Sequence, residues 1–397
     1  MRAPDSRRPS SQVVVVGAGI FGVTAALTLR ERGFDVTLCD AGPVPHPLAE
    51  STDISKIVRV DYGGDAAYTT LMEQALPRWR AWNAEWPLPL FHETGVVFLS
   101  RRVLEPEGFE HDSFRLLTAR GYPLARLDRA AIRARFPAFG DIWVDGYYNP
   151  VGGYAESGRV VQALCAKAVA LGVKLRTDAP VDEVLFEAAR VAGVHLATGE
   201  RLGADGVIVA AGAWTRRLVP DVAGFFREVG QPVFHLLPKD PAPFQLARFP
   251  VFGADIARTG YYGFGLGKEG VVKIANHGAG RAMSPDGERM VTAQEEAQLR
   301  AFLRDAIPEL AEAPIVRTRI CVYGDTLDEH FFVAEHPEHE GLVVSAGGSG
   351  HGFKFAPLLG EWAADALMRR DNPALAKFAW RTEVGVTGQE EARHHGS

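Results

Sequence analysis

The chain has 397 residues, with 43 Lys and Arg against 49 Asp and Glu and a formal net charge of −6. Hydrophobic residues make up 47% and charged residues 23%, which is ordinary for a globular protein and excludes wholesale disorder. The mild acidity argues against a nucleic-acid partner, because that would need a concentrated basic field. This length predicts two or three domains.

The three cysteines, Cys39, Cys165 and Cys321, are too few for a disulfide framework and match no zinc spacing. They indicate a reducing compartment, so we expect a cytoplasmic protein. We interpret the polar residues 1–11 as a frayed leader without a secretory signal. The uncharged run 13–29 is barely long enough for a membrane span, and its glycines favour a strand, a turn and a helix, so we expect no membrane association.

The chain opens with a strand–helix–strand pattern. Val13–Val16 is a β-branched run typical of a strand buried in a parallel sheet. Residues 23–32 have helical character and end before Gly33, and 35–39 predict a second strand. This βαβ unit predicts a doubly wound α/β sheet at the start of the chain.

Apolar residues then recur at helical spacing over 68–79 and predict a core-facing helix, whereas residues 91–148 have the texture of short strands and turns. After residue 148, predicted helices and strands alternate. We expect a helix at 158–171 and strands at 173–177, 183–187, 191–197 and 207–215. A mostly β segment at 224–327 with one helix near 292–306 follows, and then a strand, a glycine turn and a helix at 342–367.

Because nucleotide-domain texture occurs at the start, middle and end of the chain, we predict two interleaved domains. The fold class is α/β (α+β), with a Rossmann-like domain and a β-sheet-rich substrate or catalytic domain. The first is assigned to 12–93, 151–223 and 328–385, and the second to 94–150 and 224–327. We expect 1–11 and 386–397 to be flexible termini.

The first glycine turn fits the dinucleotide fingerprint G-x-G-x-x-G. Gly17 permits the tight turn, Gly19 lets the backbone approach a pyrophosphate, and Gly22 allows close helix packing, with Ile20 and Phe21 between them. The phosphates would lie at the helix N-terminus, and Asp40, at the end of the second strand, would accept from a ribose hydroxyl. The alternative is a glycine turn with no ligand, and the motif does not separate FAD from NAD.

A second small-residue turn follows the strand at 207–215. Ala211, Gly212 and Trp214 lie where backbone could approach a bound cofactor. Taken alone, an ordinary buried strand explains this segment equally well.

Residues 319–355 (RICVYGDTLDEHFFVAEHPEHEGLVVSAGGSGHGFKF) closely resemble the C-terminal signature of the monomeric sarcosine oxidase family. That family includes N-methyltryptophan oxidase and pipecolate oxidase and belongs to the D-amino-acid-oxidase-like flavoproteins. Residues 261–277, the glycine fingerprint and the segment around Arg59 resemble the same family. The resemblance implies an FAD-binding Rossmann-like domain, an amino acid substrate, O2 as acceptor and a monomer.

The resemblance implies that Cys321 forms a thioether to FAD. The alternative is that Cys321 is a small buried hydrophobe, as we expect for Cys39 and Cys165. Further cofactor contacts implied by the family pattern come from Ser55, Gly348, Gly350, His351, Gly352, Phe353 and Lys354.

The family pattern also assigns catalytic and substrate-binding residues. Lys273 matches a lysine that promotes reaction with oxygen, although an alternating strand would ordinarily turn it to solvent. His277 matches an active-site histidine, with a satisfied surface histidine as the alternative, and Tyr262 matches a tyrosine that closes over the substrate. Arg59 and Lys354 match the cations that hold the substrate carboxylate; taken alone, each would be a solvated charge.

Two departures concern the substrate. Sarcosine-oxidising members carry a histidine where this chain has Thr52 and an arginine over the flavin where it has Lys56. A catalytic lysine at position 56 looks more like fructosyl amino acid oxidases and saccharopine-type oxidases. His336 and His339 lie in a proline turn, and we expect no metal there.

The leading hypothesis is therefore an FAD-dependent amine oxidase of a secondary or cyclic amino acid that forms an imine and H2O2. One alternative is a fructosyl amino acid or saccharopine-type oxidase, or a tailoring flavoenzyme of secondary metabolism. Others are a flavin dehydrogenase with another acceptor, an NAD-dependent dehydrogenase and a catalytically silent nucleotide-binding protein.

Overall fold

The computed structural model describes residues 11–383, 388 and 390–395. Contacts divide the chain into two compact units. Unit 1 consists of Met1–Ile54, Glu156–Glu228 and Val322–Gln389, and unit 2 of Ser55–Ala155, Val229–Cys321 and Glu390–Ser397. Each unit is discontinuous in sequence, and residues 55–93 group with unit 2.

The centre of unit 1 is a mainly parallel sheet with the strand order β20-β21-β13-β1-β2-β9. Its strands are β1 (Gln12–Val16), β2 (Asp35–Cys39), β9 (Lys174–Arg176), β13 (Gly206–Val209), β20 (Phe332–Glu335) and β21 (Leu342–Ala346). β20 pairs antiparallel with β21, and the other pairs are parallel. Val13–Val16 are all buried between β2 and β13, which explains the unbroken β-branched run. The predicted α/β class and first βαβ unit are confirmed.

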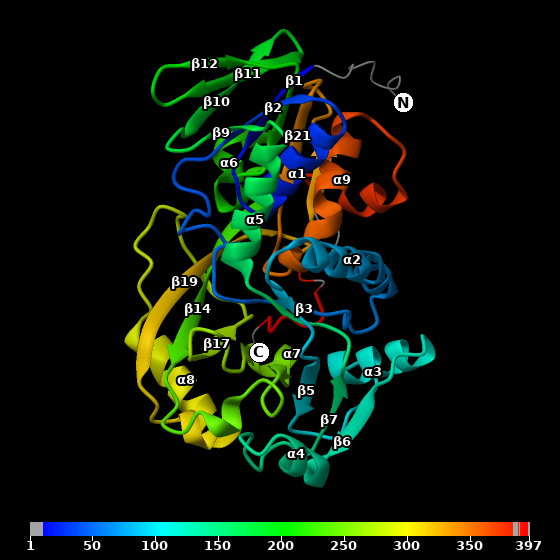
Figure 1. Cartoon of the computed structure of the whole chain (residues 1–397), viewed down its shortest axis with the longest axis vertical. Helices are drawn as coiled ribbons and strands as arrows, with labels where there is room; N and C mark the ends of the chain where they lie inside the picture. The colour runs from blue at the N-terminus through cyan, green and yellow to red at the C-terminus, as the bar shows by residue number, and fades with distance from the viewer. Residues whose placement is uncertain (1–10, 384–387, 389, 396–397) are drawn as a thin grey trace. The chain divides into compact units, whose positions relative to one another are not determined.

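Three long helices accompany this sheet: α1 (Ile20–Glu31), α5 (Ser157–Ala170) and α9 (Ala356–Leu367) among the described residues. α1 packs against both α5 and α9 (Figure 1). The α1–α9 approach depends on Gly360, since a Cβ there would lie 2.2 Å from the carbonyl oxygen of Thr24. Run 13–29 thus forms β1, a turn and α1, and no helix in the described part of the chain has the length and apolar character to cross a membrane.

Shorter elements complete unit 1. They are the antiparallel strands β10 (Val181–Glu187), β11 (Arg190–Leu196) and β12 (Arg201–Gly203), the helix α6 (Thr215–Leu218), and the 3-10 turns η1 (Gly212–Trp214), η2 (Pro220–Val222), η5 (Gly352–Phe355) and η6 (Pro373–Phe378). The strand expected over 207–215 ends at Val209. It stops because Gly212, at φ +52°, turns the chain into η1.

Unit 2 contains a large mixed sheet with the order β18-β14-β17-β16-β15-β5-β7-β6, in which β19 also pairs with β14. The strands of this sheet are β5 (Val96–Ser100), β6 (Ala125–Asp128), β7 (Asp145–Asn149), β14 (Phe226–Leu236), β15 (Val251–Ala254), β16 (Tyr261–Phe264), β17 (Val272–Asn276), β18 (Arg281–Ala282) and β19 (Ile315–Thr326). A smaller sheet joins β3 (Lys56–Val58), β8 (Gly153–Ala155) and β4 (Phe91–His92).

The helices of unit 2 are α2 (Ala66–Glu85), α3 (Phe109–Ala119), α4 (Arg129–Arg135), α7 (Ile256–Thr259) and α8 (Ala293–Ala306), with the turns η3 (Ala242–Phe244) and η4 (Pro308–Leu310). The expected helix over 68–79 is confirmed, and Tyr68 and Trp79 are buried as its spacing predicts. The expectation of only strands and turns over 91–148 was wrong, because α3 and α4 lie there. Phe109, Ser113 and Leu117 of α3 are buried at helical spacing.

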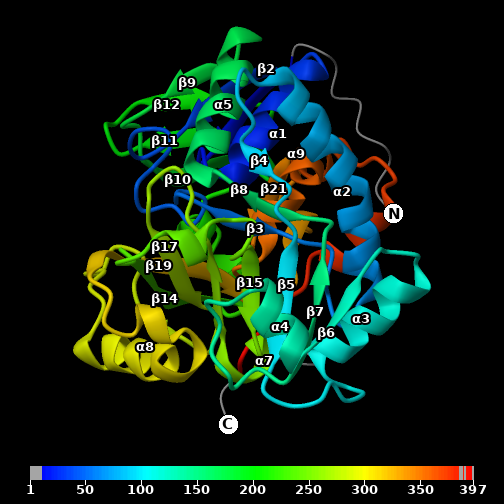
Figure 2. The same cartoon turned by 60° about the horizontal axis from the view of Figure 1, so that its bottom comes forward.

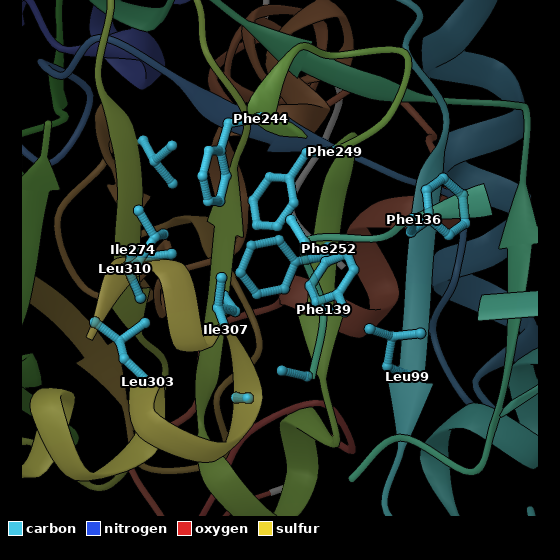
Figure 3. Close-up of a cluster of buried hydrophobic side chains, with 14 of the residues drawn as sticks. Leu99, Phe136, Phe139, Phe244, Phe249, Phe252, Ile274, Leu303, Ile307 and Leu310 are labelled. Carbon is cyan, nitrogen blue, oxygen red and sulfur yellow. The ribbon is translucent and has the colours of Figure 1, made fainter. Parts of the chain in front are cut away.

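The main core of unit 2 is aromatic. α8 lies beside β14 and β17 (Figure 2), and its Leu303 shares one apolar cluster with Ile274 of β17. Figure 3 shows phenylalanine rings gathered at the centre of this cluster. Phe139 and Phe249 stack with ring centroids 4.6 Å apart, and Phe252 meets Phe249 edge-on at 5.2 Å. This core fixes β15, β16 and β17, which carry several of the predicted site residues.

Candidate active site

In the glycine turn between β1 and α1, one of the three motif glycines, Gly19, has free space beside its Cα. Gly17 has φ +97°, and a Cβ there would lie 2.5 Å from the carbonyl oxygen of Ala210. A Cβ on Gly22 would lie 1.7 Å from the carbonyl oxygen of Gly17. For a Cβ on Gly19, by contrast, the one described atom within 4 Å is Ser51 Oγ, at 3.4 Å. The protein's own packing therefore requires Gly17 and Gly22, whereas Gly19 leaves room for a ligand.

The N-terminus of α1 can receive an anion. Gly19 is its N-cap and offers no side chain to the first turn. Ser51 Oγ accepts from Ile20 N at 2.9 Å, and Phe21 follows in the same turn. Backbone N–H groups and the helix dipole at such an end favour a phosphate, so this cradle fits the phosphates of a dinucleotide.

Asp40 lies directly after β2 and is buried. Its Oδ2 accepts from Ala18 N at 2.7 Å and its Oδ1 from Gly42 N at 3.1 Å. Burial raises the pKa of Asp40 above its ordinary value, and these two donors oppose that rise. A carboxylate oxygen can accept more than one hydrogen bond, so Asp40 can shape the turn and also bind a ribose hydroxyl.

A second cradle in unit 1 follows β21. Gly350 has φ +73°, and a Cβ there would overlap the ring of Tyr323 at 2.3 Å. His351 Nε2 hydrogen-bonds the carbonyl oxygen of Glu329 at 2.9 Å, and Gly352 and Phe353 begin η5 before α9. Gly348 lies near the first cradle, because a Cβ on it would be 3.4 Å from the ring of Phe21.

Lys354 of η5 is 2% exposed, and its Nζ donates to the carbonyl oxygen of His351 at 2.8 Å. It precedes the N-terminus of α9, where an ammonium opposes the helix dipole. A buried cation in this position favours an anionic ligand.

Sequence reasoning missed Glu50 in unit 1. Its Oε1 accepts from Gly324 N at 2.6 Å and lies 3.9 Å from where a Cβ on Gly212 would be. Its Oε2 lies 3.7 Å from the corresponding position at Gly348. Glu50 therefore lies close to three glycines: Gly212 of η1, Gly324 of β19 and Gly348. Ala211 is the N-cap of η1, which ends at Trp214. No local pattern in the sequence indicated this role.

Unit 2 brings together Lys56, Lys273 and Cys321. Lys273 of β17 is 1% exposed, and its Nζ donates to the carbonyl oxygen of Ser55 at 2.6 Å. Lys56, which follows Ser55 in the sequence, places its Nζ 3.9 Å from the sulfur of Cys321. The solvent-facing alternative for Lys273 is therefore wrong.

The same segment carries hydroxyl groups with unused hydrogen-bonding capacity. Ser55 Oγ is buried and has no hydrogen-bond partner among the described residues. Thr52 Oγ1, in unit 1, is also buried and has no hydrogen-bond partner in the described part of the chain. Because buried polar groups are normally satisfied, both hydroxyls fit contact with a ligand.

The three cysteines differ in their surroundings. Burial raises the pKa of the Cys39 thiol to about 11 and raises that of Cys165 as well. Both are buried, as expected for core residues. Cys321 is also buried, and its sulfur differs from the other two in having the Lys56 Nζ 3.9 Å away.

Tyr262 shares a sheet face with Lys273. β16 and β17 pair antiparallel, with Phe264 opposite Lys273 and Tyr262 opposite Ala275. Residues two apart on a strand point to the same side, so Tyr262, Phe264 and Lys273 lie on one face. The Lys273 Nζ lies 4.8 Å from the centre of the Phe264 ring.

Arg59 and His277 meet at a carboxylate of the C-terminal segment, which we define as Glu390–His395. Arg59 Nη2 donates to Glu390 Oε1 at 3.1 Å, and His277 Nε2 lies 2.7 Å from Glu390 Oε2. The surface alternatives for Arg59 and His277 are wrong, because both are buried. Glu390 was not predicted as a site residue; residues 390–395 were expected to be flexible, yet Glu390, Ala392 and Arg393 are buried. The expected flexible residues 1–10, 386, 387, 389, 396 and 397 lie outside the described residues.

The two histidines of the proline turn contact residues of unit 1. His336 Nδ1 accepts from the backbone N of Glu338 and of His339, each at 3.1 Å. The His339 ring packs on Phe186 with centroids 4.2 Å apart. Among the described residues, no group of three or more His, Cys, Asp or Glu side chains could hold a metal ion.

Comparison with known proteins gives consistent results. The sequence profile of the family described as "FAD dependent oxidoreductase" (DAO) matches residues 12–366. Monomeric sarcosine oxidase from Bacillus sp. (strain B-0618) is 30% identical over 372 residues, which cover 88% of this chain and 90% of that protein. N-methyl-L-tryptophan oxidase from Salmonella arizonae is 28% identical over 365 residues, covering 90% and 95%.

Solved structures agree. Fructosyl amine:oxygen oxidoreductase (Amadoriase I) from Aspergillus fumigatus has a TM-score of 0.83 and 27% identity, covering 96% of this chain and 91% of that one. Fructosamine oxidase (Amadoriase II) from the same organism has a TM-score of 0.85 and 25% identity, covering 98% and 95%. The resemblance inferred from residues 261–277 and 319–355 is confirmed.

Proposed function

This chain belongs to the family of FAD-dependent oxidoreductases, and we propose that it oxidises a secondary or cyclic amino acid to an imine, with O2 reduced to H2O2. The observation that carries the proposal is the grouping in unit 2 of Lys56 with the buried Lys273 and Cys321. The names of relatives that refer to sarcosine and N-methyl-L-tryptophan support an N-alkyl amino acid as substrate.

FAD, when bound, supplies the acceptor for a hydride equivalent from the substrate carbon next to nitrogen. The residues that we propose to hold it are Gly17, Gly19, Ile20, Phe21, Gly22, Asp40, Ser55, Ala211, Gly212, Trp214, Cys321, Gly348, Gly350, His351, Gly352, Phe353 and Lys354. The space at Gly19 and the Ser55 hydroxyl, which has no hydrogen-bond partner in the described part of the chain, support this assignment. We propose that the Cys321 sulfur forms a covalent thioether to FAD.

The proposed roles of the other side chains are electrostatic. The planar Arg59 guanidinium suits bidentate binding of the substrate carboxylate, for which Lys354 is the second proposed cation. Lys56 and Arg59 disfavour a protonated substrate amine, so that its nitrogen keeps the lone pair that oxidation requires. Lys273 holds a fixed positive charge that stabilises negative charge developing on oxygen. His277 and Tyr262 contact the substrate in this proposal.

A fructosyl amino acid oxidase is the second candidate function. Lys56 and the similarity to two amadoriases favour it. A peroxide assay decides between the candidates with a panel of N-methyl, cyclic, N-(carboxyalkyl) and N-(1-deoxyfructosyl) amino acids. Highest kcat/KM with N-methyl or cyclic compounds supports the first candidate, and highest kcat/KM with the fructosyl compound supports the second.

Acid precipitation tests the cofactor assignment. Yellow colour should stay with the precipitated wild-type protein, and Cys321→Ser should release it into the supernatant. Colour released equally from both proteins contradicts a covalent link. One mole of H2O2 per mole of substrate would exclude a dehydrogenase with another acceptor.

We further propose that the enzyme is a cytoplasmic monomer. Three free cysteines, Cys39, Cys165 and Cys321, support a reducing compartment. The word "monomeric" in the name of a relative supports the oligomeric state. Gel filtration with light scattering tests it.

A further inference from the structure

The C-terminal segment places a carboxylate on the cation that we assign to substrate binding. Glu390 bridges Arg59 at 3.1 Å and His277 at 2.7 Å, and its side chain is 3% exposed. An α-carboxylate of an amino acid has the same planar geometry and charge. Glu390 therefore makes, from within the chain, the contact proposed for the substrate.

Several contacts hold this segment in unit 2. Glu391 accepts from Gly64 N at 2.9 Å, and His394 N donates to the carbonyl oxygen of His277 at 3.0 Å. Ala392 is 1% exposed and belongs to an apolar cluster with Tyr147 and Phe264. The position of Glu390 is thus built by packing and hydrogen bonds of its neighbours.

Among the described residues, Glu390 is the carboxylate to which Arg59 donates a hydrogen bond. Asp61 is also buried nearby, but its oxygens accept from Tyr147 Oη at 2.8 Å and from Asn149 Nδ2 at 3.2 Å. The Arg59 guanidinium packs over the Tyr62 ring at 4.6 Å, and its Nη1 has no hydrogen-bond acceptor in the described part of the chain. A buried guanidinium needs an anion, and Glu390 supplies it.

Resting on the function proposed above, we propose that Glu390 is a specificity-determining residue that competes with the substrate carboxylate for Arg59. A substrate that carries a carboxylate replaces Glu390 at Arg59, so that Arg59 keeps an anionic partner while Glu390 keeps its contact with His277. An amine or amide without a carboxylate leaves the Arg59–Glu390 pair in place. Glu390 thereby raises the KM of every carboxylate substrate and favours those that bind Arg59 with two oxygens.

Ligand binding to the full-length holoenzyme tests this proposal. Titration calorimetry measures the Kd of 2-furoate, a planar carboxylate, and of 2-furamide, its neutral amide. Glu390→Gln should lower the Kd of 2-furoate at least about tenfold, because a charge-assisted hydrogen bond no longer has to be replaced. The Kd of 2-furamide should change much less.

The matched control is Glu391→Gln, which removes a neighbouring carboxylate of the same segment that bonds Gly64 rather than Arg59. It should leave the Kd of 2-furoate at the wild-type value. Glu390→Asp keeps the charge but shortens the side chain, so it should give a smaller decrease in Kd. This variant retains a negative partner for Arg59 and decides the question if Glu390→Gln does not fold.

An unchanged or higher Kd for 2-furoate in the Glu390 variants would overturn the proposal. A higher Kd would instead mean that Glu390 is a fixed part of the site that binds the substrate amine. Because calorimetry needs no turnover, failure of the proposed oxidase function is seen separately. It would appear as no H2O2 from any amino acid in the wild type, whatever the Kd of 2-furoate.

Discussion

At the scale of single residues, Lys273 is the side chain whose position most needs a functional explanation. It is 1% exposed in a strand, beside Phe264, and its Nζ donates to the backbone carbonyl oxygen of Ser55. Burying an ammonium group in a strand is costly for folding. Such a group is typical of functional sites, where a fixed charge is used in the reaction.

Lys273→Met should therefore affect reoxidation of the flavin by O2 much more than reduction of the flavin by substrate. We expect anaerobic reduction of the flavin by substrate to stay within a few-fold of wild type. Reoxidation by O2 should slow by about 100-fold or more, because a charge that stabilises the reduced oxygen is lost. Stopped-flow absorbance measures both rates.

Lys268→Met is the matched control, since Lys268 is an exposed lysine in the turn before the same strand. It should change neither rate. Wild-type oxygen kinetics in Lys273→Met would remove the role assigned to that residue.

Glu110 gives a pH-dependent prediction for stability. It is 3% exposed in α3 and accepts from Ile256 N at 3.1 Å. Burial and the neighbouring Asp255 raise the pKa of Glu110 from 4.5 to about 7. The folded protein thus holds a proton on Glu110 at pH values where the unfolded chain has released it.

The sign follows from this linkage: the contribution of Glu110 to the free energy of unfolding is fully present below about pH 4.5 and is lost as pH rises through about 7. Between pH 4.5 and 8 the wild type should lose up to about 3 kcal/mol relative to Glu110→Gln, which cannot ionise. Urea unfolding of both proteins at several pH values measures the difference. A difference that does not vary with pH, or that changes in the opposite direction, would contradict the prediction.

At the scale of elements, the opening βαβ unit could be predicted closely from sequence. The strand expected at 35–39 is β2 itself, and the helix expected from Val23 begins at Ile20. Short-range signals suffice here, because β-branched runs, glycine turns and helical spacing are local patterns. α3 was not predicted, since its buried residues follow a glycine turn in a segment dominated by strand-like runs.

Substitutions in the glycine turn between β1 and α1 can distinguish a glycine that the fold requires from one that cofactor binding requires. Gly22→Ala should destabilise the fold, because its Cβ would lie 1.7 Å from the carbonyl oxygen of Gly17. Gly19→Ala meets only Ser51 Oγ at 3.4 Å within the described residues, so it should fold normally but hold less FAD. Circular dichroism and the ratio of flavin to protein absorbance measure the two effects.

Gly224→Ala controls for the loss of a glycine as such, since no described atom lies within 4 Å of a Cβ at Gly224. It should keep both the wild-type fold and the wild-type flavin content. Full flavin content in Gly19→Ala would argue against phosphate binding at this turn.

At the scale of the whole molecule, sequence reasoning identified the family but not the contacts that long-range packing adds to the candidate residues. Glu50 and Glu390 gave no local signal, because their roles depend on Gly324 and Arg59, which are distant in sequence. The polar composition of residues 390–395 suggested a flexible end, whereas Ala392 and Arg393 are buried in unit 2. Composition reports average polarity and cannot show which polar groups find partners.

The covalent attachment of FAD to Cys321 is the central claim, and mass spectrometry of a tryptic digest tests it most directly. Cleavage after Arg319 and Lys354 yields one peptide that contains Cys321 and neither of the other cysteines. We predict that this peptide carries the mass of the flavin, while the peptides with Cys39 and Cys165 are unmodified. An unmodified Cys321 peptide, from protein that stays colourless after incubation with FAD, would contradict the account.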